Sequence, residues 1–155
     1  MRGKQAPKRV IAPDPKYNSQ NVAKLINYLM RKGKKSVAQR IVYGALELVS
    51  KETKRDPLEA YEEALKNVMP QVEVKSKRVG GANYQIPMPV RGERRLALGL
   101  RWIIEASNAK KGKPMAEKLG AEIVAAAKNE GDAVRKKNDV HRMAEANRAF
   151  AHFAR

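Results

Sequence analysis

The segment between Val72 and Val90 alternates apolar and polar residues on both sides of a Gly80-Gly81 pair, whereas the flanking regions repeat their apolar residues every three or four positions. Alternation with a period of two is typical of strands, and a glycine pair between two such runs is typical of a tight turn. The segment therefore predicts a β-hairpin within an otherwise helical chain.

The same alternation predicts how the two strands pair. A loop with an odd number of residues would place nearly all apolar side chains on one face of the hairpin, because side chains alternate between the two faces of a strand. We therefore expect a glycine-containing loop of three or five residues. The pairs expected in this register are Val72 with Val90, Val74 with Met88, Ser76 with Ile86, and Arg78 with Tyr84.

Two prolines restrict where the hairpin can lie. Pro87 and Pro89 have the same parity, so the positions of both missing N–H groups should point away from the partner strand. Only a strand with a free edge tolerates this arrangement, which predicts a two-stranded ribbon outside any larger sheet. Such a ribbon is marginally stable alone in water. Its cations Lys75, Lys77 and Arg78 predict that it rests on a nucleic acid.

Helical patterns precede the hairpin. The apolar spacing predicts a helix over about 19–32. Ser36 and Gln39 resemble a capping box that opens a second helix, and Asp56-Pro57 is a strong start for a third. The chain is thus expected to enter the hairpin from a group of three helices.

Three more helices are expected after the hairpin, over about 92–109, over 114–127, and from a cap at Asn138 or Asp139 onward. The predicted fold class is mainly α: a bundle of about six helices with a protruding two-stranded β-hairpin. A length of 155 residues suits a single domain. Its expected parts are a basic extended arm (1–17), three helices (18–70), the hairpin (71–90) and three further helices (91–155).

The charge of the chain indicates its partner. Lys and Arg number 33 against 16 Asp and Glu, which gives a net charge of +17. Such an excess disfavours an isolated compact chain by self-repulsion and favours a polyanion, for which nucleic acid is the leading candidate. The residues predicted to contact phosphates are Arg2, Lys4, Lys8, Arg9, Arg31, Lys32, Lys34, Lys35, Lys75, Lys77, Arg78, Arg91, Arg94, Arg95, Arg101, Lys110, Lys111 and Lys113.

Plainer interpretations exist for two of these basic regions. The arm, kept out of a helix by its prolines, is expected to be disordered without its partner, and the alternative is a merely solubilising tail. The turn between the first two helices carries four cations within Arg31–Lys35 and no intervening acid. A solvated turn is possible there, but cations that repel one another are better explained by a phosphate-binding corner.

The sequence shows no catalytic, metal or cofactor site, and we expect none of the three. It has no cysteine, and its two histidines, His141 and His152, are too far apart on the predicted last helix to share a metal. Gly80-Gly81 lacks the lysine and the following helix of a phosphate-binding loop. No apolar run approaches the ~18 residues of a membrane span, so a cytoplasmic protein without membrane contact is expected.

Three stretches resemble a known family. RVGGANYQIPMPV in the hairpin, the RR..AL.LRW pattern after it, and MAEANRAFAH near the C-terminus strongly resemble small-subunit ribosomal protein seven of the bacterial type. The resemblance extends from Lys24 to Phe153. It implies a helical protein with a protruding β-ribbon that binds the three-prime domain of small-subunit ribosomal RNA and nucleates assembly of the subunit head.

The resemblance also implies roles for single residues. The phosphate contacts above would be contacts with ribosomal RNA. Arg142 and Arg148 would lie toward the messenger path and small-subunit protein eleven, and protein nine would be another neighbour. The hairpin tip would approach the exit-site transfer RNA with Arg78, Val79, Gly80, Gly81, Ala82, Asn83 and Tyr84.

Two other functions fit parts of the sequence. A DNA-bending architectural protein also uses a β-arm, but such arms wedge an apolar residue or proline from the tip, and here the tip is Gly80-Gly81-Ala82. A helical scaffold for protein interactions would not need the basic turn. We therefore expect a structural RNA-binding protein of the ribosome.

Overall fold

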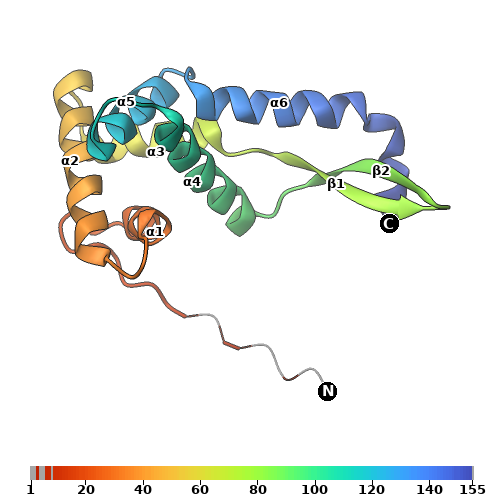
Figure 1. Cartoon of the computed structure of the whole chain (residues 1–155), viewed down its shortest axis with the longest axis horizontal. Helices are drawn as coiled ribbons and strands as arrows, with labels where there is room; N and C mark the ends of the chain where they lie inside the picture. The colour runs from red at the N-terminus through yellow and green to blue at the C-terminus, as the bar shows by residue number, and fades with distance from the viewer. Residues whose placement is uncertain (1–2, 4–5, 8, 155) are drawn as a thin grey trace.

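The computed structural model describes residues 3, 6, 7 and 9–154. These residues form a helical body from which a two-stranded ribbon projects, with the last helices beside it (Figure 1). The predicted fold class is confirmed. The elements are α1 (Gln20–Leu29), α2 (Lys35–Thr53), α3 (Pro57–Val68), β1 (Val72–Val79), β2 (Ala82–Pro89), α4 (Gly92–Ala109), α5 (Met115–Ala127), α6 (Asp132–Ala146) and the 3-10 helix η1 (Arg148–Ala154).

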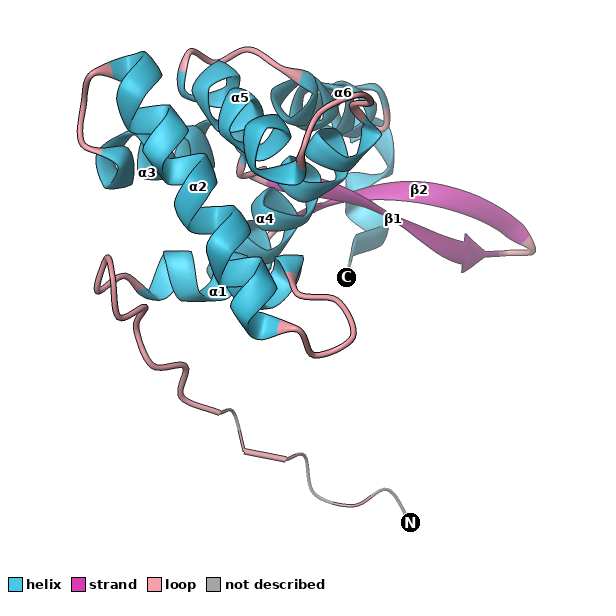
Figure 2. Ribbon diagram, turned by 60° about the vertical axis from the view of Figure 1, so that its left-hand side comes forward, coloured by secondary structure: helices cyan, strands magenta, loops and turns pink. Residues whose placement is uncertain are grey.

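The core of the body lies around α5, which packs against both α2 and α3 (Figure 2). Leu46 of α2 and Leu119 and Ile123 of α5 are completely buried. Gly120 lets α5 approach α2 closely, because a Cβ at this position would lie only 3.2 Å from the carbonyl oxygen of Ala45. A larger residue there would force the two helices apart, at the expense of the close packing on which core stability depends.

The predicted register of the hairpin is wrong. The loop contains two residues, Gly80 and Gly81, and Val74 pairs with Pro87 rather than with Met88. Both glycines have positive φ, +58° and +91°, which is the conformation of the tight turns whose twist matches that of antiparallel strands. The full pairing is Val72 with Pro89, Glu73 with Met88, Val74 with Pro87, Lys75 with Ile86, Ser76 with Gln85, Lys77 with Tyr84, Arg78 with Asn83, and Val79 with Ala82.

The register fails because both faces of the ribbon are covered near its base. Val74 lies on one face and lines a cavity with Leu98 and Trp102 of α4. Glu73 and Ile86 lie on the opposite face, and both are buried. Gathering all apolar side chains on one face is a valid criterion only when the other face meets water, so it does not apply here.

The predicted orientation of the two proline nitrogens, away from the partner strand, is nevertheless confirmed. The ribbon is a separate two-stranded sheet. The Val90 N–H donates to the Gln71 carbonyl at 3.0 Å, and hydrogen-bonded pairs alternate along an antiparallel ladder. Pro87 and Pro89 therefore fall at the positions whose nitrogens face away from β1. The missing donors leave the ladder intact.

The protein itself supports the ribbon, which the sequence had led us to assign to nucleic acid alone. Figure 1 shows α6 running beside the strands and the C-terminal end turning back against them, and the contacts of β2 with η1 agree. The Tyr84 ring lies 5.1 Å from that of Phe150 and 5.5 Å from that of Phe153. Lys77 Nζ also donates to the Phe153 carbonyl at 2.9 Å. We call this arrangement the C-terminal brace.

Of the three helix caps predicted from the sequence, two are wrong and one is confirmed. Asp56 caps α3 by accepting the Leu58 N–H. However, α2 begins at Lys35, and no side chain of a capping box closes its end. The last helix begins at Asp132 rather than at 138 or 139. Its first turn is capped by a residue of another helix: the buried Glu122 of α5 accepts the Ala133 N–H at 2.9 Å.

The end of the N-terminal arm is anchored to the body, contrary to the expectation of an arm disordered through residue 17. Asp14 is only 3% exposed. Its carboxylate accepts the N–H groups of Lys16 and Tyr17 and the Tyr43 hydroxyl, the last at 2.8 Å. Burial and this hydrogen bond raise the pKa of Tyr43 to about 12. As predicted, no helix forms in the described part of the arm.

The junction between α3 and β1 depends on a neutral histidine. The Gln71 N–H donates to Nε2 of His141 at 3.2 Å, so this nitrogen must carry a lone pair. Burial, followed by the nearby charge of Lys137, lowers the pKa of His141. Lys137 in turn donates to the Asn67 carbonyl at 2.7 Å, which ties α6 to the end of α3.

Loss of the C-terminal brace should loosen the outer half of the ribbon while the body stays folded. In Phe150→Ala and Phe153→Ala, the amides of 76–85 should exchange with solvent about 5-fold faster in hydrogen-exchange measurements, because each variant removes a ring interaction worth about 1 kcal/mol. Arg148→Ala, whose exposed side chain pairs only weakly with Glu145, is the control. Unchanged ribbon exchange in both phenylalanine variants would contradict the brace.

Acid should weaken the junction at His141. A histidine pKa that is lower in the folded protein means that the unfolded chain binds the proton more readily, so stability is complete above about pH 6.5 and decreases as the pH falls toward the folded-state pKa. Urea unfolding at pH 7.5 and pH 5 should therefore show a smaller pH-dependent loss in His141→Gln than in the parent protein. An equal loss in both proteins would exclude His141 as the source.

Candidate nucleic-acid interface

A sharp basic turn joins α1 to α2. Every residue of Arg31–Lys35 is exposed. Lys32 and Gly33 both adopt left-handed conformations, and the Lys34 N–H closes the turn on the Arg31 carbonyl at 3.1 Å. The conformation holds four cations together in water, where repulsion would otherwise separate them. We call this segment the basic corner.

The structure brings the end of α4 and the start of α5, on either side of their connecting loop, next to the basic corner. Arg31 and Lys34 line one groove of about 350 Å³ together with Asn108 and Lys118. Lys111 and Lys113 on the same loop are exposed. Lys118 was missed by sequence reasoning because its position on α5 gives no sign that it faces the corner. Two basic regions far apart in sequence therefore form one cationic surface.

Lys110 differs from its neighbours on that loop. Its ammonium forms an ion pair with Glu122, which is completely buried. Removing one partner of a buried pair leaves an uncompensated charge and is strongly destabilising. The structure thus gives Lys110 an internal role in addition to the phosphate interaction predicted for it.

The three arginines of α4 and Arg91, which directly precedes the helix, divide into two pairs. Arg94 Nε lies 2.8 Å from a carboxylate oxygen of Glu73, and Arg95 Nε donates to the Pro70 carbonyl, so both hold the base of the ribbon. Arg91 and Arg101 are exposed and make no such interaction among the described residues. Sequence reasoning assigned all four to phosphates because nothing in the pattern showed that Glu73 would be buried.

The ribbon presents its cations and its tip to solvent. Lys75, Lys77 and Arg78 are exposed, although Lys75 also lies 3.3 Å from Glu73 and Lys77 belongs to the C-terminal brace. From Arg78 through Asn83 the tip is exposed apart from the half-buried Val79, and Tyr84 is half-buried under the brace. The tip is therefore free to approach a partner.

Arg142 on α6 and Arg148 on η1 are both exposed. Arg142 pairs with Asp139 and Arg148 pairs with Glu145, each at 3.4 Å and three residues away. Such surface pairs contribute little and exchange readily for a phosphate. Both arginines are accessible to a partner, as their predicted role requires.

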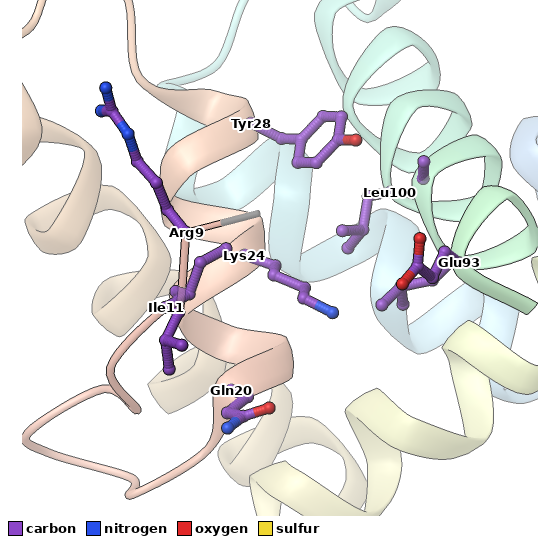
Figure 3. Close-up of a pocket in the computed structure, with 10 residues that line it drawn as sticks. Arg9, Ile11, Gln20, Lys24, Tyr28, Glu93 and Leu100 are labelled. Atoms are coloured by element: carbon purple, nitrogen blue, oxygen red, sulfur yellow. The ribbon is translucent and has the colours of Figure 1, made fainter. Parts of the chain in front are cut away.

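The arm leads to a second groove. Of its predicted cations, Arg2, Lys4 and Lys8 lie outside the described residues, whereas Arg9 is exposed and lines a groove of about 560 Å³ between the arm, α1 and α4. In Figure 3, Lys24 and Tyr28 extend from α1 toward α4, and Glu93 faces them. Sequence reasoning did not assign Lys24 or Tyr28 to any site.

Nothing in the described part of the chain resembles a metal centre, since no group of three or more suitable side chains lies together there. The histidines have local roles: His141 accepts the Gln71 N–H, and the His152 ring hydrogen-bonds the Ala149 carbonyl. None of the described helices has the length and hydrophobicity needed to cross a membrane. The prominent feature of the surface is exposed positive charge.

Comparison with known proteins places the chain in a family. Residues 1–148 match the sequence profile of ribosomal protein S7p/S5e. The chain is 62% identical to small ribosomal subunit protein uS7 of Caldanaerobacter subterraneus subsp. tengcongensis, over 95% of this chain and 94% of the relative. Identity to the uS7 proteins of Thermosipho africanus and Thermotoga maritima is 60% and 57%, over 99% of each chain. The chain belongs to the ribosomal protein S7p/S5e family and is a structural, RNA-binding protein of the small ribosomal subunit rather than an enzyme.

Proposed function

We propose that the chain binds the three-prime domain of small-subunit ribosomal RNA and nucleates assembly of the subunit head. The observation that carries this proposal is the groove that the basic corner shares with the end of α4 and the start of α5, on either side of their basic loop. Phosphates of a folded RNA come together at fixed distances, and a rigid cationic surface can match that arrangement.

The ribbon supports a second interaction of the same protein. Its tip is exposed, carries Arg78, and is made of small residues that allow close backbone approach. We propose that the tip lies near the exit-site transfer RNA and the messenger path. Arg142 and Arg148, on the α6 and η1 helices beside the ribbon, would face the messenger and protein eleven, and protein nine would be a further neighbour in the head.

The DNA-bending alternative finds less support. The wedge that such a protein inserts between base pairs needs a large apolar residue at the tip of its arm. Here the loop is Gly80-Gly81, flanked by Val79 and Ala82. Pro87 and Pro89 lie near the base of the ribbon, close to α4. The geometry favours a partner recognised by shape and phosphate position.

Neutralising the basic corner should weaken RNA binding, because it removes charges that pair with phosphates. In the double variant Lys32→Ala/Lys34→Ala, the slope of log K against log salt should flatten by ~0.7–0.9 for each phosphate interaction removed, with filter binding to a three-prime-domain fragment as the measurement. The control Lys51→Ala/Lys66→Ala removes the same charge from exposed positions on α2 and α3. Equal effects in the two double variants would show that only net charge matters.

Competition should separate the RNA-binding and DNA-bending proposals. At matched salt, a duplex DNA of the same length should displace the ribosomal RNA fragment at least about 10-fold less well than the unlabelled fragment itself, since the DNA lacks the folded arrangement of phosphates. Equal competition by the two nucleic acids would contradict the ribosomal RNA proposal.

A further inference from the structure

We infer that the groove between α1 and α4 receives one unstacked nucleobase of ribosomal RNA, with the Tyr28 ring as its stacking surface. The inference rests on the proposed RNA-binding function and adds to it a mode of recognition other than phosphate pairing. Neither wall of this groove belongs to the basic corner or to the ribbon.

The walls of the groove come from α1, from α4 and from residues 9–11 of the arm. Gln20, Lys24 and Tyr28 are four residues apart and share one face of α1. Leu96 and Ala97 are half-buried and share the facing stripe of α4 with the completely buried Leu100. The groove of about 560 Å³ is open to solvent and is lined by both apolar and polar side chains (Figure 3).

Tyr28 is the reason to expect a planar ligand. All five tyrosines lie in the described part of the chain, and the other four are buried or half-buried, whereas Tyr28 is 44% exposed. Tyr17 and Tyr43 pack against each other, and Tyr84 packs under the brace. An exposed aromatic ring beside an apolar surface is what an unstacked base requires, because RNA-binding proteins read splayed bases by stacking them on such rings.

The charges around the groove select a nucleotide over an apolar peptide side chain. Lys24 on α1 extends into the groove and can pair with a phosphate beside a base, while Arg9 on the arm lines the outer edge of the groove with its guanidinium directed away from Tyr28 (Figure 3). The amide of Gln20 also lines the groove, where it can hydrogen-bond the polar rim of a base. With two cations and the carboxylate of Glu93, the lining keeps a net positive charge that a phosphate offsets and an apolar peptide side chain does not.

Ultraviolet cross-linking of the unmodified full chain to a three-prime-domain RNA fragment tests the inference directly. Mass spectrometry of the digested complex should find a nucleotide attached to the peptide that contains Tyr28. Cross-links confined to other peptides would overturn the inference, and this measurement does not depend on the folding of any variant.

Binding measurements then give the size of the effect. Tyr28→Ala should lower affinity for the fragment about 5- to 150-fold, the range of one stacked base, without changing the salt slope. Tyr28→Phe keeps the ring and should bind within about 2-fold of the parent protein. Lys24→Ala should instead flatten the slope by ~0.7–0.9, as expected when one phosphate is no longer neutralised. Met143→Ala, at an exposed position on α6, is the unchanged control.

The outcomes distinguish this inference from the proposed function. Parent-like binding by Tyr28→Ala, together with no cross-link at Tyr28, would overturn the base-binding groove and leave ribosomal RNA binding in place. Failure of the unmodified chain to bind the fragment would contradict both. A reduced salt slope in Tyr28→Ala would show that the ring positions a cation against a phosphate and would overturn its role as a stacking surface.

Discussion

Three buried carboxylates attach the charged segments of this protein to its helical body. Asp14 holds the end of the arm against Tyr43, Glu73 holds the base of the ribbon against Arg94, and Glu122 joins Lys110 and the start of α6 to α5. With a net charge of +17, mutual repulsion would drive the basic segments away from the body. Each carboxylate opposes that repulsion at the point where a segment begins, and each has at least two hydrogen-bond or ion-pair partners.

These interactions explain how a protein with such a large positive charge keeps one conformation in the absence of RNA. A surface that recognises folded RNA must hold its cations at fixed separations, because phosphate positions carry the information. Glu73 fixes the base of the ribbon and the C-terminal brace fixes its outer half, so the ribbon is supported at two points along its length. Rigid presentation reduces the ordering cost that a flexible arm would add to binding.

The sequence was sufficient to predict what depends on local pattern. The helical segments, the hairpin, the outward direction of the proline nitrogens and the Asp56 cap all follow from period, parity and helix-start chemistry within a few residues. The register and the start of α6 could not be predicted, because both depend on interactions between distant segments. The ribbon has two covered faces, and the cap of α6 comes from Glu122, ten residues before Asp132.

The candidate interface shows the same division. Its cations could be predicted by residue type, since lysines and arginines on loops are exposed in almost any fold. The sequence could not show which of these cations would instead bind within the protein. Arg94, Arg95 and Lys110 contact internal acceptors that only the folded chain brings near them. Tyr28 was missed for another reason: it shares the polar face of α1 with Gln20 and Lys24, and the sequence does not show that this face meets the apolar residues of α4 across a groove. An aromatic ring that is 44% exposed beside such a groove is therefore a stronger sign of a ligand than one more exposed lysine in a chain that has many.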